Sequence, residues 1–175
     1  MNPPPFDHDT LRHSLESAGL RCTPQRLAVY SELCRIPHHP TAEEVFHAVR
    51  RQIPRISLAT VYKALEALVE IGAASRLTAD NASGSARYDA RNEAHYHFRC
   101  LRTGDVHDLP TPFDPDLLSK LHPHLQQELR AHGFRVTGYR LELVGYRDES
   151  AGVVAAGDGL PRTAPACWGQ DGIDE

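Results

Sequence analysis

The sequence SLATVYKALEALVEIG, residues 57–72, is the most informative stretch of this chain for its fold. Its apolar residues recur at intervals of three, four and three, the spacing that places side chains on one face of an α-helix: Leu58, Val61, Leu65 and Leu68. Ser57 is a preferred N-cap residue, and Gly72 is a preferred residue just after a helix end. The pattern therefore predicts an amphipathic helix with one face in a core and the other exposed.

Three further helices are predicted before this one. Thr41-Ala42-Glu43-Glu44 is a capping box, and Thr23-Pro24 combines an N-cap residue with a proline at the first helical position. The first helix is expected to start at Asp9 or Thr10 as its cap and to stop at Gly19.

After the fourth helix the spacing of apolar residues changes. Residues 73–77 and 86–89 flank a polar turn at 80–85, which predicts a β-hairpin. Short helices followed by a hairpin are the order of a winged helix-turn-helix, in which the helix over 57–71 would enter the major groove of DNA.

Residues 91–147 are predicted to form a second unit. It should contain short strands at 95–101 and 105–109, a helix over 114–132 and an alternating segment over 134–146. The helix carries leucines at a strict interval of four: Leu117, Leu121, Leu125 and Leu129. Because its strands are few, this unit is expected to complete itself against a second copy.

The whole chain is thus expected to be α+β. Residues 1–90 would be a winged-helix DNA-binding domain with a hinge, and residues 91–147 a small α/β dimerisation and metal-binding domain. Residues 148–175 carry one basic and six acidic side chains and few apolar ones, so an acidic, disordered tail is expected.

Composition excludes several classes of protein. The mean hydropathy of −0.44 and the lack of an apolar run near 18 residues exclude a membrane span. The first residues carry neither a basic end nor an apolar stretch, so no secretory signal is expected. Four widely spaced cysteines do not form a disulfide framework, which favours the cytoplasm.

Charge is unevenly distributed along the chain. The net charge is −4, but residues 19–63 carry seven basic and three acidic side chains. Such a local basic region suits a phosphate-backbone partner, and an ordinary solvated surface is the alternative.

Histidines and aspartates provide the clearest chemical signal. His95 and His97 are two positions apart on a predicted strand, so both imidazoles face one side. Asp89 ends the hairpin, Asp108 lies on the next strand, and His39 precedes the third helix. Imidazoles combined with carboxylates form a mixed nitrogen and oxygen site that suits Fe(II), Mn(II) or Zn(II).

At several motifs the chain resembles the ferric uptake regulator (Fur) family of metal-dependent bacterial repressors. The motifs are GLRCTPQR (19–26), HPTAEEV (39–45), SLATVYKAL (57–65), RYD (87–89) and HYH (95–97) followed by Cys100. The resemblance spans residues 8–147 and implies a winged-helix domain followed by an α/β dimerisation domain.

The resemblance also implies a regulatory metal site at His39, Asp89, His95, His97 and Asp108. Ligands from both domains and from the hinge would meet at one Fe(II) or Mn(II) ion, with Zn(II) also possible. Two aspartate ligands resemble the peroxide-responsive (PerR) branch of the family.

Two departures from the family pattern are evident. The structural zinc site of the family usually has two Cys-x-x-Cys pairs, whereas at the matching positions this chain has only Cys100, with Thr103 in place of its partner and with Arg147 and Ser150 in place of the second pair. No structural zinc held by four cysteines is therefore expected. An additional site of some members also looks lost, because Ala94, Tyr96 and Tyr139 stand where ligands are expected.

Candidate DNA-contacting residues cluster at the helix over 57–71. Thr60, Lys63 and Ala67 are placed opposite its apolar face, and Tyr62 at the edge of that face. Tyr62 can contact a thymine methyl group or a phosphate, and Lys63 a base edge or a phosphate. The remaining candidates are Ser57 and Thr60 at the helix start, for phosphate, and Arg21, for the DNA backbone or minor groove.

The sequence thus predicts a homodimeric, metal-dependent repressor of a palindromic operator, controlling peroxide-stress or metal-homeostasis genes, and not an enzyme. An iron- or manganese-uptake regulator without peroxide sensing is the alternative within the family. A mononuclear metallohydrolase and a metal-independent interaction module are the alternatives from other classes.

Overall fold

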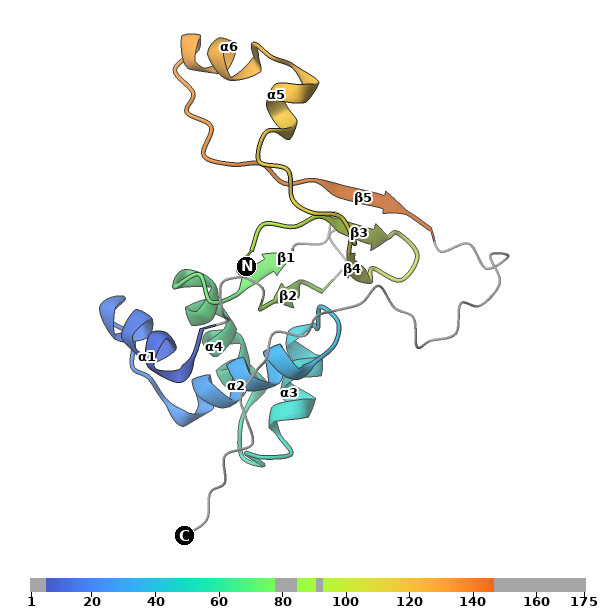
Figure 1. The fold of residues 1–175 in the computed structure, drawn as a ribbon. Helices are drawn as coiled ribbons and strands as arrows, with labels where there is room; N and C mark the ends of the chain where they lie inside the picture. Colours follow the sequence, from blue (N-terminus) through green and yellow to red (C-terminus); the bar gives the residue numbers. More distant parts are fainter. Residues whose placement is uncertain (1–5, 78–84, 91–92, 147–175) are drawn as a thin grey trace. The chain divides into compact units, whose positions relative to one another are not determined.

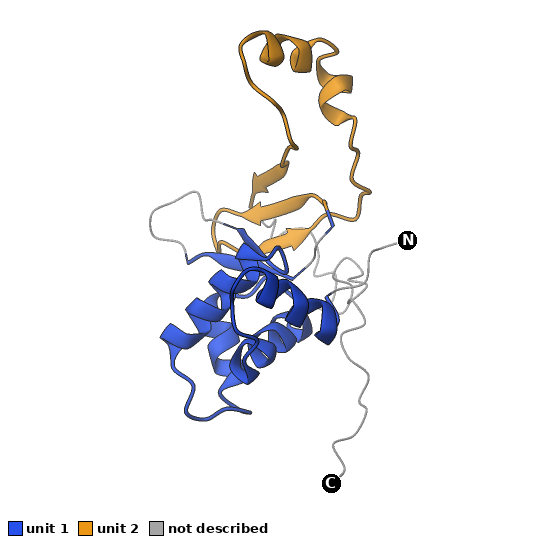
Figure 2. Ribbon diagram, turned by 90° about the vertical axis from the view of Figure 1, so that its left-hand side faces the viewer, with its two compact units in different colours: residues 1–93, 162–175 blue, residues 94–161 orange. Residues whose placement is uncertain are grey.

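The computed structural model describes residues 6–77, 85–90 and 93–146 (Figure 1). Of these residues, those up to Glu93 form one compact unit and those from Ala94 onward form another (Figure 2). Most of the polar turn expected at 80–85 lies outside the described residues. The whole of the acidic tail expected over 148–175, which includes Cys167, also lies outside them.

The N-terminal unit contains four helices, α1 to α4: His8–Ser17, Pro24–Arg35, Ala42–Val49 and Leu58–Glu70. The starts of α2, α3 and α4 follow the predicted capping residues. The Thr23 hydroxyl accepts from the Arg26 amide at 3.3 Å, and the Ser57 hydroxyl accepts from the Thr60 amide at 3.1 Å. Thr41 and Glu44 form the predicted reciprocal capping box. The predicted starts of α2, α3 and α4 are confirmed.

The start of α1 differs from the prediction. Asp7, and neither Asp9 nor Thr10, is the N-cap, since its carboxylate accepts from the Thr10 amide at 2.7 Å. Asp9 instead lies in the first turn, where its negative charge interacts favourably with the positive end of the helix dipole. The helix ends before Gly19, as predicted, and Gly19 has a φ of 73°.

The core of this unit lies among its four helices and includes Leu11 and Leu15 of α1. Of the predicted apolar face of α4, Leu58 is half-buried and the other three residues are buried: Val61, Leu65 and Leu68. Ala67 was expected opposite this face but is 5% exposed, so that expectation is wrong. The reason is that α4 packs against both α2 and α3, which requires a wider apolar face than a single packing partner would.

Two strands complete the N-terminal unit. β1 (Ser75–Leu77) and β2 (Arg87–Asp89) pair antiparallel, with Arg76 opposite Tyr88, which confirms the predicted hairpin. The segment before α3 lies along the other side of β2. The Tyr88 amide donates to the Pro40 carbonyl at 2.9 Å, and Thr41 forms an antiparallel bridge with Arg87.

The second unit contains a three-stranded sheet in the order β4-β3-β5. β3 (His97–Cys100) pairs antiparallel with β4 (Val106–Asp108) and parallel with β5 (Glu142–Gly145). The two predicted strands around residue 103 are confirmed. The alternating segment over 134–146 is a strand only at its end. There the Arg99 guanidinium donates two hydrogen bonds, of 3.0 and 2.9 Å, to the Glu142 carboxylate.

The single helix predicted over 114–132 is wrong. The structure has two short helices, α5 (Leu117–Leu121) and α6 (Leu125–Ala131). Pro123 explains the break, because proline lacks an amide donor and forces the preceding residue out of the helical region. His122 accordingly has an extended backbone, with φ of −149° and ψ of 100°. The leucine stripe is therefore divided between two helices.

None of the helices in the described part of the chain combines the length and apolar character that crossing a membrane requires.

Candidate functional site

Three of the predicted metal ligands converge in the second unit. His97 on β3 lies opposite Asp108 on β4, and His95 lies two residues before His97. One carboxylate oxygen, Asp108 Oδ1, lies 3.2 Å from His95 Nε2 and 3.7 Å from His97 Nε2. The two imidazole rings meet edge to face with centroids 4.4 Å apart. The sheet register therefore brings two imidazoles to one carboxylate.

This group of three residues, which we call the β3/β4 cluster, is shielded from water. The side chains of His95, His97 and Asp108 are 12%, 14% and 11% exposed. A buried carboxylate requires compensation by positive charge or hydrogen bonds. The borderline nitrogen and hard oxygen donors of the cluster fit a first-row divalent cation such as Fe(II), Mn(II) or Zn(II).

The other two predicted ligands converge in the N-terminal unit. His39 Nε2 lies 3.7 Å from Asp89 Oδ2, and the side chains are 2% and 3% exposed. His39 precedes the segment that pairs with β2, and Asp89 is the last residue of β2. Backbone pairing between that segment and β2 therefore brings together two residues that are 50 positions apart in the chain. We call them the His39/Asp89 pair.

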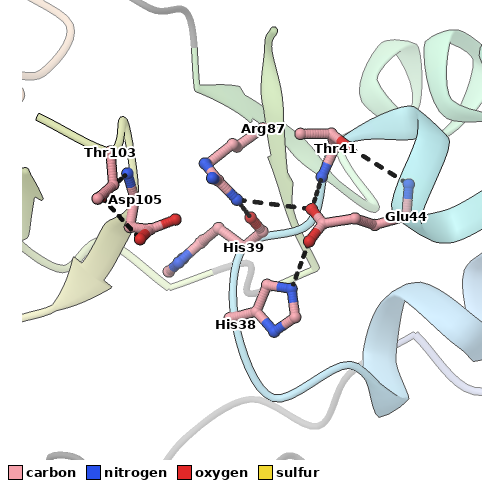
Figure 3. A network of polar contacts seen from close by, with 7 residues as sticks. All are labelled: His38, His39, Thr41, Glu44, Arg87, Thr103 and Asp105. Atoms are coloured by element: carbon pink, nitrogen blue, oxygen red, sulfur yellow. Dashed lines mark hydrogen bonds and ion pairs between the residues drawn. The ribbon is translucent and has the colours of Figure 1, made fainter.

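Arg87 holds the histidine segment in place. Its guanidinium donates to the His39 carbonyl oxygen at 2.8 Å and lies 3.6 Å from the Glu44 carboxylate (Figure 3). Glu44 also accepts from the Thr41 amide at 2.7 Å and contacts His38 at 3.2 Å. Burial raises the pKa of Glu44, but the contacts with Thr41, His38 and Arg87 outweigh it, so the net pKa is lowered. This carboxylate is thus ionised at neutral pH and fixes the Arg87 side chain.

Arg87 was not among the residues predicted for the site. The available signal was its place two residues before Asp89, which puts both side chains on one face of a strand. His38 is exposed and bonded to Glu44, in agreement with the expectation that it faces solvent. His107 alternates away from the β3/β4 cluster and is exposed.

The cysteines and tyrosines near the predicted sites have packing roles. Cys34 and Cys100 are buried, and Cys22 packs partly against the N-terminal core. The Tyr96 and Tyr139 hydroxyl groups form a hydrogen bond of 2.8 Å with each other. The Tyr96 hydroxyl also accepts a hydrogen bond from the Asp114 amide at 2.9 Å.

Two of the predicted DNA-contacting residues, Tyr62 and Lys63, lie on the exposed face of α4, whereas Thr60 is half-buried. Tyr62 is 37% exposed, and Lys63 is exposed beside it. The Ser57 and Thr60 hydroxyls lie 2.8 Å apart at the start of the helix. Arg21 is exposed before α2, and its carbonyl accepts from the Arg26 guanidinium. One contact of this face was not predicted: the Tyr62 hydroxyl donates to Glu43 of α3 at 2.8 Å.

Comparison with known proteins identifies the family. The model of the ferric uptake regulator family matches residues 17–144. The chain belongs to this family. Its Fur-family membership confirms the resemblance drawn from the sequence motifs.

Individual relatives agree with this assignment. Over 132 residues, the Fur-family chain is 36% identical to the peroxide-responsive repressor PerR of Staphylococcus epidermidis, and the match covers 75% of this chain and 82% of the relative. The structure of the Campylobacter jejuni peroxide stress regulator is 27% identical, with a TM-score of 0.53 over 79% of this chain and 93% of the other.

A third comparison concerns the fold. The Helicobacter pylori ferric uptake regulator Fur has a TM-score of 0.64 at 22% identity, covering 84% of this chain and 95% of the other. The predicted α+β fold, with a winged helix-turn-helix unit followed by a small α/β unit, is thereby confirmed. As a Fur-family member, the protein is a metal-responsive transcriptional repressor and not an enzyme.

Proposed function

We propose that this Fur-family repressor is a homodimer that binds a palindromic operator when Fe(II) or Mn(II) is held by His39, Asp89, His95, His97 and Asp108. The observation that carries the proposal is the pair of buried donor sets, the β3/β4 cluster and the His39/Asp89 pair. Zn(II) suits the same donors and is the third candidate ion.

The two units together offer more ligands than either does alone. The β3/β4 cluster provides three residues and the His39/Asp89 pair two, and Mn(II) and similar ions take about six ligands when these are nitrogen and oxygen. We infer that one ion shared by both sets holds the two units in a single arrangement. An ion that binds only this arrangement shifts the population toward it.

The same shift explains how metal controls DNA binding. In a dimer, two copies of α4 must enter major grooves separated by about one helical turn of DNA. A fixed arrangement of the two units within each chain would set that separation. The α4 residues Ser57, Thr60, Tyr62 and Lys63, together with Arg21, are the proposed DNA contacts.

We further propose that the repressor controls genes of peroxide stress. The two aspartates among the proposed ligands and the 36% identity to a peroxide-responsive repressor support this assignment. Control of iron or manganese uptake, without peroxide sensing, is the second candidate. In either case the partners are operator DNA and a second copy, and the site of action is the cytoplasm.

A mobility-shift assay tests the proposal. Purified full-length protein would be mixed with AT-rich inverted-repeat DNA in chelator, and with Mn(II), Zn(II) or, without oxygen, Fe(II). We expect a shifted complex only when metal is present. Equal binding in chelator and in metal would contradict the proposed control by metal. The absence of DNA binding under every condition would contradict the proposed binding to a palindromic operator.

A further inference from the structure

A hydrogen bond joins the DNA-facing helix to the helix before it in the N-terminal unit. The Tyr62 hydroxyl on α4 lies 2.8 Å from Glu43 Oε1 on α3. Tyr62 is 37% exposed, so its ring is accessible on the outer face of α4, whereas Glu43 is half-buried. The contact connects an exposed aromatic side chain to a fixed position at the start of a capped helix.

The direction of this hydrogen bond is unambiguous. The bond lowers the pKa of Glu43 and raises the pKa of Tyr62, in each case as the largest cause. At neutral pH the carboxylate is therefore ionised and the phenol protonated. An ionised carboxylate only accepts hydrogen bonds, so the phenol is the donor.

This direction limits what Tyr62 can do on DNA. A tyrosine hydroxyl has one proton, and phosphate oxygens only accept, so Tyr62 cannot donate to a phosphate while it is bonded to Glu43. Its ring remains able to contact the methyl group of thymine. Its oxygen can still accept from the amino groups of adenine or cytosine in the major groove.

We propose that Glu43 is a specificity-determining positioning residue, because it holds the Tyr62 hydroxyl and thereby directs Tyr62 to base edges and away from the phosphate backbone. This inference rests on the proposed function, in which α4 faces the operator. Glu43 acts through Tyr62. Phosphate contacts contribute affinity without sequence information, whereas base contacts contribute specificity.

The test measures discrimination of the thymine methyl group. A DNA duplex would first be selected from a random-sequence pool with the Mn(II)-loaded, full-length wild-type protein. Affinities would then be measured by fluorescence anisotropy for this duplex and for a copy with uracil in place of thymine. The ratio of the two affinities reports contact with the methyl group.

Four proteins form a double-mutant cycle: wild type, Glu43→Ala, Tyr62→Phe and the double variant. We expect Glu43→Ala to lower the thymine-to-uracil ratio by about threefold or more, in the range of coupling between contacting residues. In the Tyr62→Phe background the same change should have no effect, because no hydroxyl proton remains to be held. Glu43→Gln keeps an acceptor oxygen and should retain the wild-type ratio.

Glu70→Ala is the matched control, since it removes the same charge from an exposed position of α4. It should leave the ratio unchanged, and an equal loss with Glu70→Ala would overturn the inference in favour of a general charge effect. An equal effect of Glu43→Ala with and without the Tyr62 hydroxyl would also overturn it, because Glu43 would then act through α3 itself. Failure of the wild-type protein to select any duplex would instead refute the proposed function.

Discussion

His97 and Asp108 lie directly opposite each other in the antiparallel pair of β3 and β4, with Nε2 and Oδ1 3.7 Å apart. Because alternate residues of a strand face opposite sides, a slip of one residue in this register would turn one of the two side chains away. The backbone hydrogen bonds of the sheet therefore set the positions of these donors before any metal binds.

Removal of either member of this pair should weaken metal binding. We expect Asp108→Ala or His97→Ala to reduce Mn(II) affinity by at least about tenfold. Removing a residue that only hydrogen-bonds to a metal ligand already costs about tenfold or more, and these two residues are proposed to be ligands themselves. Isothermal titration calorimetry of the full chain measures the affinity. His107→Ala is the matched control, since His107 is on the same strand as Asp108 but exposed. Equal losses in all three variants would show that the cluster is not the ligand set.

Arg87 should influence metal binding without being a ligand. Its hydrogen bond to the His39 carbonyl holds the histidine segment against β2. We expect Arg87→Ala to lower Mn(II) affinity by about tenfold, and Arg87→Lys to restore part of it. Circular dichroism would verify that the helices remain folded. Unchanged affinity in Arg87→Ala would mean that the β2 pairing alone positions His39.

The outer face of α4 should be needed for operator binding alone. Tyr62→Ala or Lys63→Ala should abolish the shifted complex, since each lost contact costs about 1–3 kcal/mol in each half-site. Dimer mass and Mn(II) affinity should not change, because neither residue lies in the core or among the proposed ligands. Wild-type operator affinity in both variants would show that another element contacts the bases.

The dimer should not depend on structural zinc. A single thiolate, Cys100, cannot replace the four that a structural zinc site uses. We expect no chelator-resistant zinc by elemental analysis and an intact dimer by light scattering in chelator. One tightly held zinc per chain would contradict this prediction.

Exposed apolar side chains of the second unit are available for the dimer instead. They are Leu143 and Val144 on β5, Tyr146 just after it, and Phe134 just after α6. Val144→Asp should produce monomers, because it replaces one of these apolar side chains with a charge. A stable dimer in that variant would direct attention to the separated leucines of α5 and α6.

Peroxide should inactivate the iron form only. Bound Fe(II) would supply electrons to hydrogen peroxide, whereas Mn(II) is a poor reductant for it. We expect irreversible loss of DNA binding in the Fe(II) protein and one added oxygen on the peptide that contains His39 or His95, detected by mass spectrometry. Cysteine oxidation at Cys100 or Cys167 is the competing route, and of these Cys100 is 5% exposed. Equal loss in the Mn(II) form, or recovery with a thiol reductant, would favour a plain metal-uptake regulator.

Local sequence signals determined the elements of the N-terminal unit. Thr23, Thr41 and Ser57 each accept a hydrogen bond from an amide three residues later, which depends only on neighbouring residues and so can be predicted from the sequence. Where two local signals competed, the prediction was less accurate. The leucine interval favoured one long helix, but Pro123 outweighed it, since a missing amide and a steric clash cost more than an apolar stripe gains.

Which distant residues meet depends on how the chain packs in three dimensions. His39 reaches Asp89 because the segment before α3 pairs with β2, and Tyr62 reaches Glu43 because α4 packs against α3. The sequence marks His39 and Asp89 as candidate ligands and Tyr62 as a candidate DNA contact, but it assigns no role to Glu43. Their pairing depends on strand register and on the angle between helices. Those are set by the burial of the whole core, and no local pattern in the sequence encodes them.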